Sequence, residues 1–114
     1  MRSTILIAAL AAAVLPAGPA GAEEFGDARR GIAYAQKTCA GCHAILFEDL
    51  ASPNPASPPF KVVADTPGMT RTALSVFFQT PHPTMPNLLV EGDDADDLIA
   101  YILSLKGEGA KSPR

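Results

Sequence analysis

The sequence predicts a small all-α domain in which three to four helices are joined by proline-rich loops. Three stretches, 27–39, 70–79 and 92–106, carry apolar residues at helical spacing behind a residue that can open a helix. Two segments between them, 51–60 and 81–87, hold four and three prolines, too many for a helix or a central strand. No stretch shows the sustained alternation of a half-buried strand, so we expect no sheet.

The first helix is predicted over 27–39, with Asp27 as its N-cap. Gly31 lies inside it, where glycine costs about 1 kcal/mol relative to alanine. Two explanations remain open at this stage. Another helix crosses closely at Gly31, or the glycine is only a weak point of the helix.

A short helical turn is expected at 61–64, and a longer helix begins after Thr70, which can cap it. Its apolar residues stand at i, i+3 and i+4: Leu74, Phe77 and Phe78. The helix should stop at Thr80, because the next residue is a proline.

The last helix has the clearest pattern, an apolar stripe formed by Leu98, Tyr101, Ile102 and Leu105. Gly92 opens it, and Gly107 can close it in the left-handed conformation. We interpret the four acidic residues of its first turns as a solvated helix start that suits the helix dipole, not as a catalytic cluster: Asp93, Asp94, Asp96 and Asp97.

Residues 1–22 have the features of a cleaved signal peptide. Arg2 precedes an unbroken apolar run of 11 residues, 5–15, and small residues end at Ala22, after which cleavage is expected. A retained membrane anchor is the alternative, but 11 residues are too few to cross a hydrocarbon core of about 30 Å. The mature domain is then 23–114, which we expect to be periplasmic, without a membrane span.

The charge of the mature chain limits its partners. With a formal net charge of −4 after removal of Arg2, the domain lacks the basic face that nucleic-acid binding needs. The same charge permits docking to a basic protein surface. The sequence therefore argues against a nucleic-acid partner.

Residues 39–43 read CAGCH and contain both cysteines of the chain and one of its two histidines. Three chemistries use such spacing: thiol–disulfide exchange, a zinc site and covalent haem attachment. Thiol–disulfide exchange motifs normally lie in a βαβ unit, and this chain shows no strands. A zinc site would need the remote His82 as its fourth ligand. In the haem reading, Cys39 and Cys42 point to one side of a turn as thioethers, and His43 follows as an axial iron ligand. We favour this reading, with one haem c as the cofactor.

A second axial ligand has three candidates outside the signal peptide: Met69, His82 and Met85. Met85 stands between Pro83 and Pro86, which would fix the loop that presents its sulfur. We expect Met69 to pack in the core and His82 to be exposed. Met85 is therefore the predicted ligand opposite His43.

With these motifs in place, the sequence resembles the small soluble c-type cytochromes with His/Met ligation, the class I cytochrome c family. The resemblance covers 26–106 and includes GDARRG, CAGCH, a loop ending in PPF, TPHPTMPN and DLIAYILSLK. It implies the small cytochrome c fold, with its helices wrapped around one covalently bound haem. It also implies that the first and last helices cross, with Gly31 and Tyr101 at the crossing. The family often has an aromatic four residues after the glycine, where this chain has Ala35.

The family also places a proline two residues before an apolar haem contact, and the carbonyl of that proline accepts the N–H of the axial histidine. Pro58 and Phe60 match this spacing, and Pro59 is the close rival of Pro58. The resemblance thus implies haem-pocket roles for Pro58, Phe60 and Tyr101.

The function that the resemblance implies is electron transfer by a monomeric carrier, not catalysis. The alternatives are a haem enzyme subunit or gas sensor with a labile sixth ligand, and a thiol–disulfide oxidoreductase that uses Cys39 and Cys42. The chain shows no nucleophile with a base and no glycine-rich phosphate loop.

Overall fold

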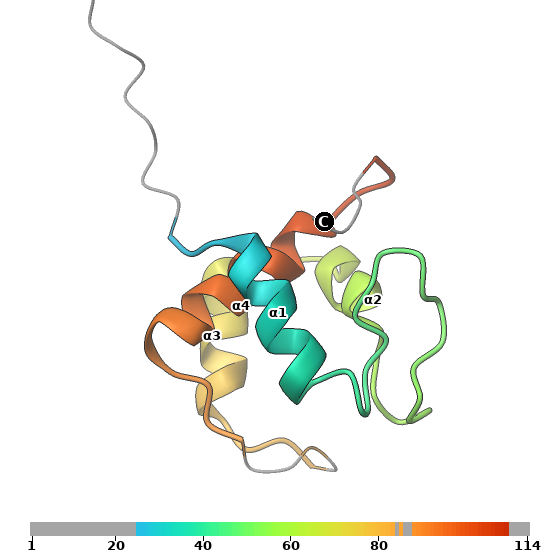
Figure 1. The fold of residues 1–114 in the computed structure, drawn as a ribbon, viewed down its shortest axis with the longest axis horizontal. Helices are drawn as coiled ribbons and strands as arrows, with labels where there is room; N and C mark the ends of the chain where they lie inside the picture. Colours follow the sequence, from blue (N-terminus) through green and yellow to red (C-terminus); the bar gives the residue numbers. More distant parts are fainter. Residues whose placement is uncertain (1–24, 84, 86–87, 110–114) are drawn as a thin grey trace, which may run out of the picture.

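The structure, a computed structural model, describes residues 25–83, 85 and 88–109. It contains four helices, α1 (Ala28–Thr38), α2 (Phe60–Asp65), α3 (Arg71–Gln79) and α4 (Gly92–Ser104), and no strand within those ranges (Figure 1). The all-α prediction is confirmed. The signal peptide expected at 1–22 lies outside the described residues.

The helix ends follow the capping residues that the sequence offers. The Asp27 side chain accepts the backbone N–H of Arg29 at 2.8 Å, and the Thr70 side chain accepts that of Ala73 at 3.2 Å. Gly107, with φ of +87°, adopts the left-handed conformation expected after the last helix. Helix α4 ends at Ser104, slightly earlier than its pattern predicts.

The close crossing of α1 and α4 explains the glycine inside α1. A Cβ on Gly31 would clash with the Asp97 carbonyl and would lie 2.7 Å from the Tyr101 Cβ. Figure 1 shows the two helices crossing near the centre of the molecule. Of the two explanations, close helix approach is therefore the one that holds.

The core lies around this crossing. The predicted stripe of α4 is buried, and Ile99 is buried with it; α2 and α3 contribute Phe60, Ala64 and Leu74. The stripe predicted on α3 is only partly correct, because Phe77 remains 48% exposed. The end of α3 thus carries an aromatic ring that the described core does not cover.

Asp97 corrects the interpretation of the acidic start of α4. It is 3% exposed and therefore not solvated, whereas Asp93 and Asp94 are exposed as expected. Its carboxylate accepts hydrogen bonds from Arg30 and from the backbone N–H of Asp27, so it joins α4 to the start of α1. A buried carboxylate needs such partners.

No helix in the described part of the chain is both long and apolar enough to cross a membrane.

Candidate functional site

The CAGCH segment forms a single turn directly after α1. Cys39 caps the C-terminal end of α1. Its carbonyl accepts the backbone N–H of Cys42 at 3.1 Å and that of His43 at 2.9 Å. Cys39 is half-buried, Cys42 is exposed, and both are free thiols. Burial raises the pKa of the Cys39 thiol to about 11. The turn therefore presents two thiols and an imidazole from five consecutive residues.

The His43 ring is held by one hydrogen bond that defines its chemistry. Its Nδ1 lies 2.7 Å from the Pro58 carbonyl oxygen. Because a carbonyl oxygen can only accept, Nδ1 carries the proton. In the neutral ring, Nε2 then has the free lone pair, and no described residue hydrogen-bonds to it. The ring is oriented to act as a ligand through Nε2.

The hydrogen bond to His43 identifies Pro58, and not its neighbour Pro59, as the proline whose carbonyl accepts from the histidine ring. The Pro59 carbonyl accepts the backbone N–H of Val63 at 3.0 Å and so belongs to the first turn of α2. Phe60 is buried, and its ring lies 5.3 Å from the His43 ring at a tilt of 46°. Of the residues for which the sequence predicts pocket roles, Pro58 and Phe60 therefore contact His43 directly.

Backbone hydrogen bonds hold the loop that follows His43 in position. The Ser52 hydroxyl accepts the N–H of Ala44 at 2.9 Å, and the Ala44 carbonyl accepts that of Phe60 at 2.9 Å. The Cys42 carbonyl accepts the N–H of Asn54 at 3.1 Å. Sequence reasoning missed Ser52, whose short hydroxyl side chain is typical of such contacts in loops, and Asn54, which contributes through its backbone N–H.

Tyr101 reaches the same loop from α4. Its side chain is fully buried, and its hydroxyl donates to the Ile45 carbonyl at 2.6 Å, two residues beyond His43. Ala35, where the family often has an aromatic, is also fully buried, and Tyr34 packs at the edge of the core. The departure from the family pattern therefore leaves the helix crossing intact.

The candidates for the second axial position have different surroundings. Met85 is half-buried in a bend of the loop between α3 and α4. Met69 is buried in the core, as expected. His82 is not simply exposed, as the sequence suggested: it is half-buried, and its ring stacks on that of Phe77 with centroids 4.9 Å apart.

Met85 lies in the loop that joins α3 to α4, and His43 lies in the turn that follows α1. Among the described residues, no hydrogen bond or ring contact joins Met85 to CAGCH. The pairing of His43 with Met85 therefore stays a prediction.

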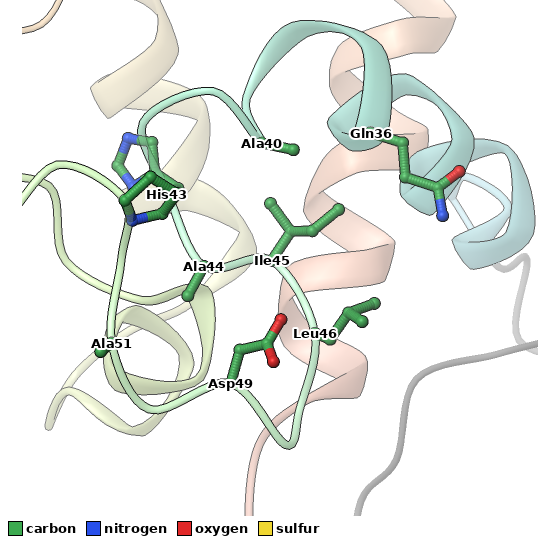
Figure 2. Close-up of a pocket in the computed structure, with 9 residues that line it drawn as sticks. Gln36, Ala40, His43, Ala44, Ile45, Leu46, Asp49 and Ala51 are labelled. Carbon is green, nitrogen blue, oxygen red and sulfur yellow. The ribbon is translucent and has the colours of Figure 1, made fainter.

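A cavity of about 430 Å³ lies between the end of α1 and the loop after His43 (Figure 2). In Figure 2, Gln36 and Ala40 stand on one side of it, and Asp49 and Ala51 on the other. His43 lines it, but neither cysteine does, and Met85 does not. This cavity is therefore not the space that the predicted ligands would share.

The described residues offer no zinc site. No three of their histidine, cysteine, aspartate and glutamate side chains come together in a way that could hold a metal ion. A structural zinc site needs four ligands, so the zinc reading of CAGCH gains no support from this part of the chain.

Comparison with known proteins identifies the family. The chain is 35% identical over 80 residues to cytochrome c-552 of Bradyrhizobium diazoefficiens. The aligned region covers 70% of this chain and 76% of that protein. The chain belongs to the c-type cytochromes. No protein-family model and no solved structure matches this cytochrome.

The residues of this cytochrome fit a haem. The CAGCH turn supplies two free thiols and an imidazole whose Nε2 has a free lone pair. Large apolar side chains on either side of Met85 in the sequence remain exposed: Phe77, Leu88 and Leu89.

Proposed function

We propose that the protein is a periplasmic electron carrier of the class I cytochrome c type, with one haem bound covalently through Cys39 and Cys42. His43 and Met85 are its axial ligands. Membership in the c-type cytochromes supports the haem and the electron-transfer role. Within this chain, the hydrogen bond between His43 Nδ1 and the Pro58 carbonyl carries the argument, because it prepares Nε2 as a ligand.

Each residue of the proposed site has a separate task. Pro58 fixes the orientation of the His43 ring and increases the basicity of Nε2. Ser52 and Asn54 hold the backbone on either side of His43. Pro83 limits the freedom of the loop around Met85. The haem, when bound, supplies one-electron chemistry at its iron. A rigid ligand set of this kind keeps reorganisation small.

The thioether of Met85 is expected to raise the redox potential of the iron. Relative to a second imidazole, thioether sulfur favours ferrous over ferric iron, so His/Met ligation gives a comparatively high potential. The acidic mature chain suits a redox partner with a basic docking surface. We propose that the carrier is a monomer, released after cleavage of residues 1–22.

Mass spectrometry of the exported protein tests the haem attachment. We expect a chain that begins at Glu23 and carries the mass of one haem, and we expect acid acetone to leave that haem in place. An apo mass, or extractable haem, would contradict covalent attachment through Cys39 and Cys42.

The absorption spectrum distinguishes the carrier from its alternatives. A low-spin, six-coordinate haem supports the carrier. A high-spin haem would support an enzyme or sensor with an open sixth position, and a spectrum without haem would support a dithiol protein.

A further inference from the structure

One segment of the loop after the CAGCH turn, 52–60, is hydrogen-bonded to the backbone on both sides of the histidine. Before the histidine, the Cys42 carbonyl accepts the N–H of Asn54 at 3.1 Å. After it, the N–H of Ala44 donates to the Ser52 hydroxyl at 2.9 Å. The segment is therefore fixed against the turn at both of these points.

Ser52 differs from the other residues of this segment that contact 42–44, because it uses its side chain. The contacts of Asn54, Pro58 and Phe60 use backbone atoms, which most substitutions leave in place. The contact of Ser52 uses its hydroxyl, on a half-buried side chain. Replacement of Ser52 by alanine therefore removes one contact and spares the others.

Between Ser52 and Pro58 the chain forms a stiff turn. Two of the intervening residues are prolines, whose rings fix φ. The Asn54 side chain accepts the N–H of Ala56 at 3.0 Å, and the Asn54 carbonyl accepts that of Ser57 at 2.9 Å. A change in the position of Ser52 is consequently transmitted to the Pro58 carbonyl.

The Pro58 carbonyl controls the basicity of the His43 ring. It lies 2.7 Å from Nδ1, the nitrogen that carries the proton. A stronger hydrogen bond at Nδ1 makes Nε2 a more basic ligand, and a more basic ligand favours ferric over ferrous iron. Weakening of this hydrogen bond should therefore raise the reduction potential.

We propose that Ser52 is a positioning residue for His43: its hydroxyl holds segment 52–60 against the CAGCH turn, keeps the Pro58 carbonyl on Nδ1 and so lowers the reduction potential of the iron. This role rests on the proposed ligation of the iron by His43. Ser52 acts through Pro58 and not on the iron itself.

The reduction potential of the holoprotein tests the proposal. We expect Ser52→Ala to shift the ferric–ferrous equilibrium constant toward ferrous iron roughly two- to tenfold, the range that the net contribution of one hydrogen bond covers. The potential then rises by about 18–59 mV, since a tenfold change is about 59 mV for one electron. Ser52→Thr keeps a hydroxyl and should have the wild-type potential.

Ser57→Ala is the matched control from the same turn. Ser57 contacts Asn54 through its backbone N–H, which alanine keeps, so the potential of this variant should equal that of wild type. A shift in Ser57→Ala as large as that in Ser52→Ala would overturn the proposal, and so would a shift in Ser52→Thr as large as that in Ser52→Ala.

The sign of the shift separates positioning of His43 from a merely structural role. If Ser52 only kept the loop packed, its removal would admit water to the site and stabilise the more highly charged ferric form, which lowers the potential. A lowered or unchanged potential in Ser52→Ala would therefore overturn the proposal.

Proton NMR of the ferrous holoprotein observes the affected hydrogen bond itself. The Nδ1–H of His43 should exchange with solvent roughly two- to tenfold faster in Ser52→Ala than in wild type, for the same reason as the shift in potential. In Ser52→Thr the exchange rate should be that of wild type. An unchanged rate in Ser52→Ala would show that the bond to Pro58 does not depend on Ser52, and would overturn the proposal.

The same spectra separate failure of this proposal from failure of the proposed function. If the ring protons of wild-type His43 show the strong upfield shift of a histidine bound to haem iron while the potential is insensitive to Ser52, only the positioning role fails. If those protons lack the shift, the ligation by His43 and the positioning role both fail.

Discussion

At the scale of single residues, the carboxylate of Asp97 joins the first and last helices. It accepts Arg30 Nε at 2.6 Å, Arg30 Nη2 at 2.9 Å and the backbone N–H of Asp27 at 2.6 Å. Arg30 is largely exposed, so its guanidinium stays hydrated if the carboxylate is removed. The penalty for losing the charge is then mainly the loss of these hydrogen bonds.

We expect Asp97→Asn to lower the free energy of unfolding by about 1.5–3 kcal/mol, the range for hydrogen bonds to a charged group. Asp94→Asn is the control, because Asp94 is exposed in the first turn of the same helix; it should cost well under about 1 kcal/mol. Denaturant unfolding of the holoprotein measures both. Equal effects of the two substitutions would show that burial of Asp97 contributes nothing.

The same carboxylate should make stability depend on acid. The hydrogen bond and charge of Arg30 lower the pKa of Asp97 in the folded protein. Its contribution is therefore complete above its unfolded pKa of about 3.9 and is lost as the pH falls through the lower folded value. The stability difference between wild type and Asp97→Asn should be constant near neutral pH and shrink below about pH 4. A difference that grows on acidification would contradict this assignment.

Helix-capping residues could be predicted from the sequence, whereas contacts between residues far apart in the chain could not. Asp27 and Thr70 cap helices because a cap depends only on residues within one turn. The burial of Asp97 depends on Arg30, 67 positions away. In the sequence, Asp97 looks like the other acidic residues near the start of its helix.

At the scale of elements, the crossing of α1 and α4 depends on the absence of a side chain at Gly31. We expect Gly31→Ala to destabilise the holoprotein by about 1–3 kcal/mol, because its Cβ would meet the Asp97 carbonyl and the helices would have to move apart. Gly109→Ala is the control, since nothing lies within 4 Å of the added Cβ. Thermal unfolding followed by circular dichroism compares the two. A neutral Gly31→Ala would mean that the crossing yields easily.

The contacts within the loops could not be predicted from the sequence patterns that predict helices. Proline density correctly predicted that 51–59 is not a regular element, but α2 begins at Phe60, one residue before the expected helical turn at 61–64. The same pattern did not identify the contacts of Ser52 and Asn54 that hold the loop. The position of Phe77 was also misjudged, because a helical stripe predicts a buried face without saying where the partner surface ends. His82 was expected to be exposed for lack of any local pattern that predicts a ring stack.

At the scale of the whole molecule, the domain that we expect after signal-peptide cleavage, 23–114, is short for a stable core. A domain of 92 residues buries a smaller fraction of its surface than a larger domain does, and several large apolar side chains remain exposed here. We expect the Cys39→Ala, Cys42→Ala double variant, which cannot attach haem, to be largely unfolded, since cofactor binding supplies folding free energy. Circular dichroism with a thermal scan measures this. A cooperative, native-like melt of the haem-free chain would contradict it.

The central claim, that His43 and Met85 hold the iron from opposite sides, is tested most directly by the absorption spectrum of ferric Met85→Ala. Wild type should show the weak sulfur-to-iron charge-transfer band near the red end of the spectrum, and Met85→Ala should lose it while the haem stays covalently attached. Met69→Ala and His82→Ala, in the absence of added ligand, should keep the band. A band that survives in Met85→Ala, or that disappears in Met69→Ala instead, would contradict the ligation.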